Sequence, residues 1–419
     1  MKVMYRLFII FALSLMAGRV SAEEPIIFKL PVGFQATVVA DNLGRARHIA
    51  VSENGDIYVR LNTAKSGYGV VALRDTNGDG VADIRRVFDD TGGTGIEVQI
   101  GYLYISSDTD LYRYKLIPGE LQPAAPREVV IANFPDQRQH RAKSLALDNA
   151  GNLYVNIGGP SNACQEDLRT PGSPGMDPCP QLEKHAGIWQ FKAGVLNQTQ
   201  DANGHRYSSG IRNSVAIAWN PVADALYVVQ HGRDQLDTLW PREFNKEENA
   251  DLPAEEFLLL HDGANFGWPY CYYDPYQKKK VLAPEYGGDG KIQGRCEDAE
   301  PPIMAFPAHW APNDLIFYTG KQFPKRYYGG AFIAFHGSWN RAPLPQRGYN
   351  VVFVPFKGQK PSGPYEVFAD GFAGKENFTS PSKAIHRPMG LAQSPDGALY
   401  VVDSVRGCLW KITYSGQME

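Results

Sequence analysis

The chain repeats one short pattern, in which an apolar strand is followed by a tight turn and a second apolar strand carrying Tyr or Phe. The turns of the clearest copies contain Asn-Gly, Ala-Gly or Asp-Gly, which permit the positive φ angles of a β-hairpin. Six such hairpins at blade-sized intervals predict an all-β fold, a six-bladed β-propeller. The clear copies cover residues 48–59, 144–155 and 390–401, and looser copies lie near 100–105, 216–229 and 330–335.

A propeller gathers a loop from each blade around a central mouth, so polar residues that are distant in sequence can converge there. The many Gly, Pro and Tyr residues and the lack of a long helical periodicity agree with an all-β unit. We therefore expect residues 23–419 to form a single domain. Its extra length over six bare blades lies in loops near 160–185, 270–300 and 340–348.

The first 22 residues look like a secretory signal peptide. A positive end, Met1 to Arg6, precedes an apolar run, and Val20-Ser21-Ala22 offers small residues at a cleavage site. The run is too short to span a bilayer. We therefore expect a periplasmic or secreted protein without stable membrane insertion. Removing this segment lowers the formal net charge from -3 to about -6, which argues against nucleic acid as a partner.

Five cysteines in an exported chain are disulfide candidates. The simplest connectivity pairs Cys164 with Cys179 and Cys271 with Cys296, each pair closing a long loop. Cys408 is then left over in a strand pattern, where a buried, inert thiol is expected. No Cys-x-x-Cys-His occurs in the sequence, so we expect no covalent haem.

One loop has the spacing of a calcium site. Asp75, Asn77, Asp79 and Asp83 place side-chain oxygens at alternate positions around a Gly-containing turn, as the first half of an EF-hand loop does. The twelfth position is Arg86, so the usual bidentate Glu is missing. The alternative interpretation is an Asx-rich turn that joins two strands.

Polar residues also lie at the boundaries between predicted strands and loops. His140 precedes one hairpin, and a histidine there can accept a proton near neutral pH, although a single loop histidine is often only solvated. Arg212 and Asn213 precede the next hairpin and offer fixed donors for a carboxylate or a developing oxyanion. That hairpin is followed by His231-Gly232-Arg233-Asp234, where Gly232 frees the backbone to present carbonyls.

These stretches resemble the soluble pyrroloquinoline quinone (PQQ)-dependent sugar dehydrogenases, the glucose and aldose sugar dehydrogenase group, and among them the sorbosone dehydrogenase-like branch. The resemblance covers residues from about 40 to 412, almost the whole mature chain. Besides the segments around His140, Arg212 and His231, it rests on Gly263-Ala264-Asn265-Phe266-Gly267-Trp268-Pro269, Ala308-His309-Trp310-Ala311-Pro312, Phe335-His336-Gly337-Ser338-Trp339-Asn340-Arg341 and His386-Arg387-Pro388-Met389.

The resemblance implies a role for each matching residue. His140 corresponds to the histidine that takes the sugar hydroxyl proton while hydride passes to PQQ. Arg212 corresponds to the arginine over the quinone oxygens, and Asn213 to a residue at the same cofactor edge. Backbone carbonyls of Gly232 and Arg233 correspond to those that hold calcium against PQQ.

Further cofactor contacts are implied with some departures from the family pattern. His231 aligns with a polar residue on the cofactor side, and Arg387 with an arginine that binds a PQQ carboxylate. Arg341 stands near the position of a cofactor-binding lysine, although Arg and Lys are not equivalent. His309 and Trp339 are candidate walls for a flat ring, with packing between blades as the alternative. Because Gln139 precedes His140, any acidic group that orients this histidine must come from elsewhere.

We therefore expect an exported, PQQ- and calcium-dependent oxidoreductase that oxidises a sugar hydroxyl or aldehyde. Its electrons would pass to a separate acceptor such as a quinone or a cytochrome c. Two alternatives remain, because a propeller alone implies no activity. One is a calcium-dependent lactonase-type hydrolase, although the candidate mouth is rich in His and Arg rather than Asp and Glu. The other is a non-catalytic propeller that binds carbohydrate or protein.

Overall fold

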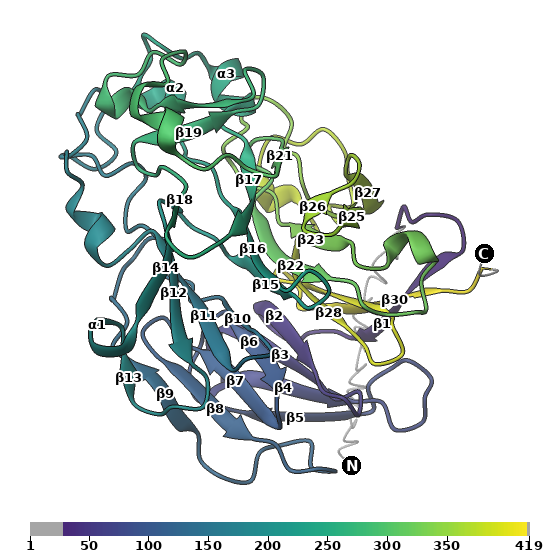
Figure 1. Ribbon diagram of the computed structural model, residues 1–419. Helices are drawn as coiled ribbons and strands as arrows, with labels where there is room; N and C mark the ends of the chain where they lie inside the picture. Colours follow the sequence, from purple (N-terminus) through teal and green to yellow (C-terminus); the bar gives the residue numbers. More distant parts are fainter. Residues whose placement is uncertain (1–27, 417–419) are drawn as a thin grey trace, which may run out of the picture.

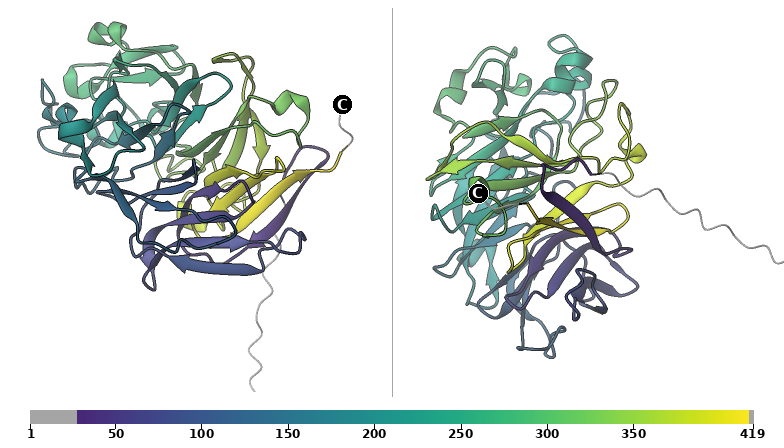
Figure 2. Two further views of the ribbon diagram at one scale, coloured as in Figure 1. Left: turned by 60° about the horizontal axis from the view of Figure 1, so that its bottom comes forward. Right: turned by 90° about the vertical axis from the view of Figure 1, so that its right-hand side faces the viewer.

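The computed structural model describes residues 28–416, and six β-sheets of four or five strands surround a common axis in this part of the chain (Figures 1 and 2). The predicted six-bladed β-propeller is therefore confirmed. The predicted signal peptide, residues 1–22, lies outside the described residues.

Each of the first three blades begins with an inner strand and runs outward as an antiparallel meander. In the second and third blades, a short parallel strand adds to the outer edge. The strands are β2 (Ala46–Val51), β3 (Ile57–Lys65), β4 (Tyr68–Arg74) and β5 (Ile84–Phe88); β6 (Ile96–Gln99), β7 (Tyr102–Ser106), β8 (Leu111–Lys115), β9 (Glu128–Ala132) and β13 (Gln198–Thr199); and β10 (Leu145–Leu147), β11 (Asn152–Ile157), β12 (Gly187–Lys192), β14 (His205–Ser209) and β18 (Ala264–Asn265).

The other three blades follow the same plan, and the N-terminal strand β1 completes the last of them by pairing with β30. The circle is thus closed by the two ends of the described chain. The strands are β15 (Ala216–Asn220), β16 (Ala225–Gln230), β17 (Glu255–Leu260) and β21 (Met304–Phe306); β22 (Pro312–Phe317), β23 (Ala331–Phe335), β24 (Asn350–Val354) and β27 (Glu366–Ala369); and β28 (Pro388–Gln393), β29 (Leu399–Asp403), β30 (Leu409–Tyr414) and β1 (Phe34–Ala40).

The clearest sequence repeats form the inner hairpins of the first, third and sixth blades. Val51 pairs with Ile57, Leu147 with Leu153, and Gln393 with Leu399. Gly55, Gly151 and Gly397 take φ angles of +90°, +77° and +88° in the three turns, a region that side-chain-bearing residues rarely adopt. The looser copy near 330–335 is instead a single strand, β23, paired with β22 and β24.

The core lies between neighbouring sheets. Phe332 and Phe353 of the fifth blade pack in one cluster with Leu391 and Trp410 of the sixth. Burying each such side chain contributes about 1.5–3 kcal/mol, so the blades are held mainly by apolar contact. Along the axis, the inner strands enclose a channel of about 260 Å³ lined in part by His48, Glu97 and Asp314.

Long insertions extend beyond this frame at one side of the propeller, where α2 (Leu236–Leu239), α3 (Lys246–Asp251) and the hairpin of β19 (Cys271–Asp274) and β20 (Lys279–Leu282) gather (Figure 1). The predicted disulfides, Cys164–Cys179 and Cys271–Cys296, are confirmed and close two of these loops. Cys408 is buried and free. The remaining short elements are α1 (Gln200–Asn203), β25 (Phe356–Lys357), β26 (Lys360–Pro361), and the 3-10 turns η1 (Pro180–Glu183), η2 (Pro284–Tyr286), η3 (Gly294–Asp298), η4 (Lys325–Tyr327) and η5 (Pro381–Lys383).

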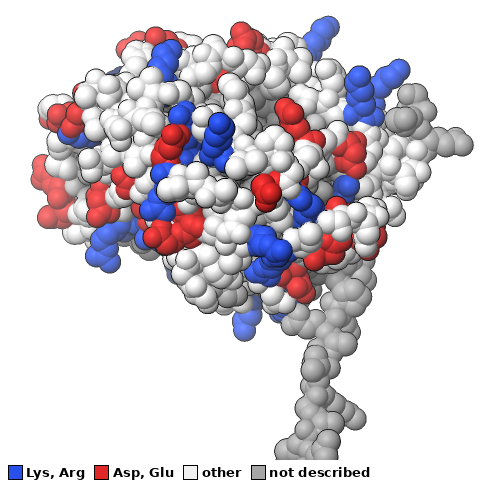
Figure 3. Space-filling model, turned by 90° about the horizontal axis from the view of Figure 1, so that it is seen from below, with Lys and Arg blue, Asp and Glu red and all other residues white. Residues whose placement is uncertain are grey.

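Within residues 28–416, no helix has the length and apolar character needed to cross a membrane. On the face drawn in Figure 3, acidic and basic side chains are interspersed rather than separated by sign. Such a surface has no extended field of one sign on that face to attract a polyanion.

Candidate active site

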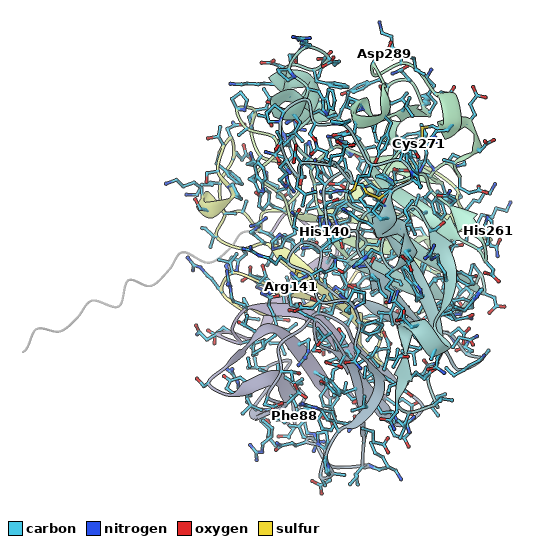
Figure 4. The ribbon with its side chains drawn as sticks, turned by 90° about the vertical axis from the view of Figure 1, so that its left-hand side faces the viewer. Phe88, His140, Arg141, His261, Cys271 and Asp289 are labelled. Atoms are coloured by element: carbon cyan, nitrogen blue, oxygen red, sulfur yellow. A yellow bond between two sulfur atoms is a disulfide. The ribbon has the colours of Figure 1, made fainter. Side chains whose placement is uncertain are left out.

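The mouth of the propeller lies where the inner strands begin. His140 stands shortly before β10, Arg212 and Asn213 before β15, and Arg387 directly before β28. Figure 4 shows His140 near the centre of the molecule with Arg141 beside it, whereas Phe88 and Asp289 lie at opposite extremes. The fold therefore brings these sequence-predicted residues of three blades to the central opening.

His140 is held in one orientation. Its backbone has a φ of 51°, and the Gln137 amide donates to the carbonyls of Gln139, His140 and Gly158 at 2.8, 3.1 and 2.9 Å. The ring Nδ1 lies 2.5 Å from the carbonyl oxygen of Gly159. Because a carbonyl only accepts, Nδ1 carries the proton, and the lone pair of Nε2 has no hydrogen-bond donor among residues 28–416. A backbone carbonyl thus takes the orienting role for which the sequence offered no acid.

Glycine is needed at position 158, directly after β11, where the chain faces His140. A Cβ on Gly158 would lie 2.7 Å from the Cβ of His140 and 2.8 Å from its carbonyl oxygen. The close approach lets the Gly159 carbonyl reach the imidazole. Burial, and then the positive charge of Arg212, lower the pKa of His140 to about 3. The imidazole is therefore neutral across the ordinary pH range, which is the form that accepts a proton.

Arg212 is fixed by acceptors on two segments, around Asn162 and around Gly232 to Asp234. Its Nε and Nη2 donate to the carbonyl and side-chain oxygens of Asn162 at 3.1 and 3.0 Å. Nη1 donates to the carbonyl of Gly232 at 2.9 Å, and Nη2 also reaches Asp234 at 3.0 Å. The side chain is only 4% exposed. A guanidinium held in this way presents its charge without reorganisation.

Asp234 is the anion that holds this side of the mouth together. Its Oδ2 accepts from Arg212 and, at 3.3 Å, from Arg169, while Oδ1 accepts from Asn340 at 2.7 Å. Burial alone raises the pKa of Asp234, but Arg212 with His309 and Arg169 outweighs burial and keeps the pKa below its ordinary value. The carboxylate therefore stays charged beside Arg212.

Asn213 and His231 lie next to each other on the same side. The Asn213 amide nitrogen is 3.4 Å from Nδ1 of His231, and Nε2 of His231 is 3.1 Å from the side-chain oxygen of Asn313. These partners place the proton of His231 on Nε2. Burial and then Arg212 lower the pKa of His231 to about 4, so this ring is also neutral.

Gly232 and Arg233 lie close to Arg212 in the chain fold, and the backbone of Gly232 and the side chain of Arg233 have different partners. The Gly232 N–H donates to Glu255 at 2.7 Å, and its carbonyl accepts from Arg212. The guanidinium of Arg233 turns away into the insertion, where both of its Nη atoms donate to Glu285. The calcium role that the resemblance implies for the backbone carbonyls of this pair stays a prediction.

His309, Trp339 and Arg341 occupy different surroundings. His309 is buried and donates from Nε2 to the carbonyl of Asn249 at 2.7 Å. Arg341 donates to the carbonyls of Pro345 and Ala250 and to Asp251, so its charge is largely used within the insertion, and its role toward a cofactor stays a prediction. Trp339 is 54% exposed.

The opposite side of the mouth contains Arg387 and two residues that were not predicted as site residues, Arg47 and His336, although His336 lies in one of the segments that carry the family resemblance. Arg387 donates from Nε and Nη2 to the carbonyls of His336 and Gly337. Burial, followed by Arg387 and Arg47, holds the pKa of His336 well below its ordinary value, so both guanidiniums lie near this ring. Among the described residues, the Arg47 guanidinium makes one hydrogen bond, from Nε to the Thr94 hydroxyl at 3.1 Å. Its position just inside an inner strand was the available signal.

The loop of residues 75–83 lies at the other end of the blade, where Arg74 pairs with Asp56 of the β2–β3 turn at 2.6 Å. Asp75 accepts from the amides of Gly78 and Gly80, and Asp79 accepts from that of Val81, each at 2.8 Å. These are Asx-turn contacts. Within residues 28–416, no group of three or more His, Cys, Asp and Glu side chains is arranged to hold a metal. Calcium at Asp75, Asn77, Asp79 and Asp83 stays a prediction.

The mouth therefore combines a neutral imidazole with a free Nε2, a fixed guanidinium beside it, and two further arginines across the opening. This arrangement can accept a proton from a hydroxyl and stabilise negative charge that develops nearby. Its several cations favour an anionic, hydrogen-bond-accepting ligand.

Proteins of two organisms match more than half of this chain in sequence. A protein of Borreliella burgdorferi that carries no functional name is 25% identical over 410 residues, covering 94% of this chain and 93% of its own. A pyrroloquinoline quinone-dependent pyranose dehydrogenase of Coprinopsis cinerea is 28% identical over 273 residues. That match covers 56% of this chain and 36% of the longer fungal protein.

The fold also matches a solved structure and a family model. The holo form of the pyranose dehydrogenase PQQ domain from Coprinopsis cinerea superposes with a TM-score of 0.73 at 20% identity, covering 93% of this chain and 97% of that domain. The resemblance to soluble PQQ-dependent sugar dehydrogenases, predicted from the sequence, is confirmed at the level of the family. Because the family model for TrAA12-like proteins matches residues 28–415, the chain belongs to the TrAA12-like family.

Proposed function

We propose that this protein is an exported PQQ-dependent oxidoreductase that oxidises a sugar hydroxyl or aldehyde. The observation that carries the proposal is the setting of His140. Its Nδ1 proton is donated to Gly159 at 2.5 Å, so the Nε2 lone pair is free, and the charge of Arg212 lies near enough to lower its pKa. Membership of a family with a named PQQ-dependent pyranose dehydrogenase among the relatives supports the same reaction class.

The donors of the mouth fit PQQ, which is flat and carries three carboxylates. Arg47 has Nη atoms for which the described residues show no hydrogen-bond acceptor, and Arg387 lies close by over the Tyr349 ring at 5.6 Å. Across the opening, Arg212 and Asn213 would face the quinone edge. Guanidinium donors match carboxylates in a bidentate geometry, so this donor set suits a polyanion better than a neutral ligand.

When bound, PQQ would supply the acceptor for the hydride, which carries both electrons away from the sugar carbon. His140 Nε2 would take the hydroxyl proton as the C–H bond breaks and the carbonyl forms. The Gly159 carbonyl would hold the imidazole in place and stabilise its protonated form. Arg212, fixed by Asp234 and Asn162, would stabilise the negative charge that arrives with the hydride.

Calcium fits these residues less well. The Gly232 carbonyl already accepts from Arg212 Nη1, and the side chain of Arg233 is turned toward Glu285. A cation here would be held by backbone carbonyls and by oxygens of the cofactor itself, next to a positive guanidinium. We therefore assign no step of the reaction to calcium.

Export to the periplasm or the outside, and transfer of electrons to a separate acceptor such as a quinone or cytochrome c, complete the proposal. The N-terminal pattern and the two disulfides support export, because disulfides persist in oxidising compartments. A soluble acceptor would have to approach the mouth, where Trp339 is exposed.

The test is a titration of the purified mature protein with PQQ, with and without calcium, that follows the quinone absorbance. A panel of aldoses and ketoaldoses is then added without oxygen. The proposal predicts saturable binding of one PQQ per chain and bleaching that depends on a sugar. Binding without bleaching by any sugar would contradict the oxidoreductase, and absence of binding would contradict the cofactor.

A further inference from the structure

A line of buried polar groups runs from the β19–β20 hairpin to Arg212. Lys280 of β20 forms an ion pair with Glu256 of β17 at 2.9 Å. The other oxygen of Glu256 accepts from the side-chain amide of Gln230 at 2.9 Å. The Gln230 oxygen in turn accepts from the backbone N–H of Arg212 at 3.0 Å.

The line continues to His140 through the main chain. The carbonyl of Arg212 accepts from the N–H of Gly159 at 2.7 Å. The Gly159 carbonyl is the group that accepts from Nδ1 of His140 at 2.5 Å. The same short stretch of backbone therefore connects Gln230 to both candidate catalytic side chains.

These groups are shielded from solvent. Gln230, Glu256 and Lys280 are 5%, 4% and 3% exposed, and Lys280 also donates to the carbonyl of Phe266 and lies over its ring at 5.7 Å. A buried ion pair is costly to desolvate and is weak evidence for stability alone. Such a pair can instead fix the position of neighbouring groups. The contacts of Gln230 with Glu256 and with the Arg212 N–H indicate this role.

The charge of Glu256 determines which way Gln230 points. A carboxylate only accepts hydrogen bonds, so the NH2 of Gln230 must face Glu256. The Gln230 oxygen is then directed to the N–H of Arg212, which needs an acceptor. Lys280 holds Glu256 in place through the ion pair at 2.9 Å. A neutral amide at position 256 removes this preference, because it can donate as well as accept.

We propose that Lys280 and Glu256 are positioning residues for the reaction: through Gln230 they fix the Arg212 backbone and, through Gly159, the imidazole of His140. The inference rests on the proposed function for its catalytic consequence. The disulfide-closed insertion that carries Lys280 is thereby part of the machinery of the mouth rather than a covering loop. Neighbouring Glu255 supports the same geometry, since it accepts from the N–H of Gly232 and thus fixes the carbonyl segment that holds Arg212.

The first test needs no activity. Hydrogen exchange of the Arg212 and Gly159 amides is measured in wild type, Glu256→Gln, Lys280→Met and Lys280→Arg. We expect exchange at these two amides to become about tenfold faster or more in Glu256→Gln and Lys280→Met, because a local opening is made easier. Lys280→Arg keeps the charge and should restore most of the protection. Unchanged protection at both amides in Glu256→Gln would overturn the proposal.

The second test uses PQQ-loaded protein and the rate at which a saturating sugar bleaches the quinone in one turnover. Misplacement of a reacting group by about 1 Å can cost on the order of 100-fold, so Glu256→Gln is expected to lower this rate by about 10- to 100-fold. The matched control is Asp56→Asn, which removes a buried partner of Arg74 at the far end of the propeller. This variant should lose stability and keep the wild-type rate.

Gln230→Met guards against a variant that fails to fold, because it interrupts the line and leaves the Lys280–Glu256 ion pair intact. If the residues act along one line, Gln230→Met and Glu256→Gln combined should slow bleaching no more than the stronger single change. Effects that multiply would overturn the proposal. If wild type bound no PQQ, the proposed function would fail, while the hydrogen-exchange test of the positioning line would still decide this inference.

Discussion

On the side of the mouth formed by the third and fourth blades, the Nε and both Nη atoms of Arg212 donate to protein acceptors, and His140 is held by Gly159. On the side formed by the first and sixth blades, the Arg47 guanidinium makes a single hydrogen bond within residues 28–416, from Nε to Thr94. The two sides therefore differ in how many guanidinium donors are hydrogen-bonded to the protein itself.

The difference separates two tasks. A guanidinium that must stabilise charge during a reaction is most effective when it is already fixed, because no reorganisation is needed. A guanidinium that binds a carboxylate needs free donors. We therefore interpret the Arg212 side as the reacting wall and the Arg47 side as the binding wall.

The largest effect is expected from Arg212→Met. The change leaves Asp234 with only part of its compensation in a mostly buried place, which should cost about 3 kcal/mol of unfolding free energy. Both the affinity for PQQ and the rate of sugar oxidation should fall. Chemical denaturation, PQQ titration and single-turnover bleaching measure the three effects. A variant with wild-type PQQ affinity and wild-type rate would show that Arg212 has no role in the reacting wall.

His140→Ala should remove the proton acceptor and leave the binding wall intact. Loss of a general base typically costs about 10²- to 10⁴-fold, so bleaching by sugar should slow by that factor while PQQ binding stays near wild type. His205→Ala is the control, since His205 is exposed and paired with Asp262. Unchanged turnover in His140→Ala would remove this residue from the mechanism.

Arg47→Met tests the binding wall. A hydrogen bond to a charged group contributes about 1.5–3 kcal/mol, so PQQ affinity should fall by roughly 10- to 100-fold. The bleaching rate at saturating PQQ should change less than the affinity. Arg141→Met is the matched control, because Arg141 is already paired with Asp108 at 3.3 Å. Equal affinity losses in both variants would indicate a general charge effect and no specific wall.

The pH profile tests the setting of His140. Burial and Arg212 lower its pKa to about 3, and the neutral form is the active base, so activity is lost only as pH falls toward that value. We expect kcat/KM to stay nearly constant from pH 8 to about 5. In Arg212→Met the acid limb should move to higher pH, because one cause of the lowered pKa is gone. A wild-type acid limb near pH 6.5 would contradict this electrostatic setting.

The smallest effect is expected from Asp79→Asn in the loop at the opposite end. Asp79 is exposed and accepts from the loop amide of Val81. Its replacement should change stability by less than about 0.5 kcal/mol and leave oxidation unchanged. A large loss of thermal stability, together with loss of a calcium-dependent rise in melting temperature, would instead identify a structural calcium site in residues 75–83.

The sequence was sufficient to predict the frame because turn chemistry and strand alternation are local. Gly151 and Gly397 mark their hairpins, and residues that precede inner strands reach the mouth in any propeller. The disulfides could also be predicted, since each couple of cysteines closes its own loop. His140 and Arg212 were located by the same reasoning.

Contacts made by the insertions could not be read in this way. Asn340 rather than Arg341 reaches Asp234, and Gly159 supplies a carbonyl where an acid was sought. Both outcomes depend on the way in which the long loops fold over the blades, and the residue types alone do not indicate these roles. The pairing of Lys280 with Glu256 likewise joins segments whose approach is set only by tertiary packing.

The most direct measurement is a crystal structure of the protein with PQQ and a slowly oxidised sugar bound. The account predicts one PQQ in the mouth, with carboxylates on Arg47 and Arg387, the quinone edge at Arg212 and Asn213, and the sugar hydroxyl within hydrogen-bond distance of His140 Nε2. PQQ bound elsewhere, or a sugar hydroxyl directed away from His140, would contradict it.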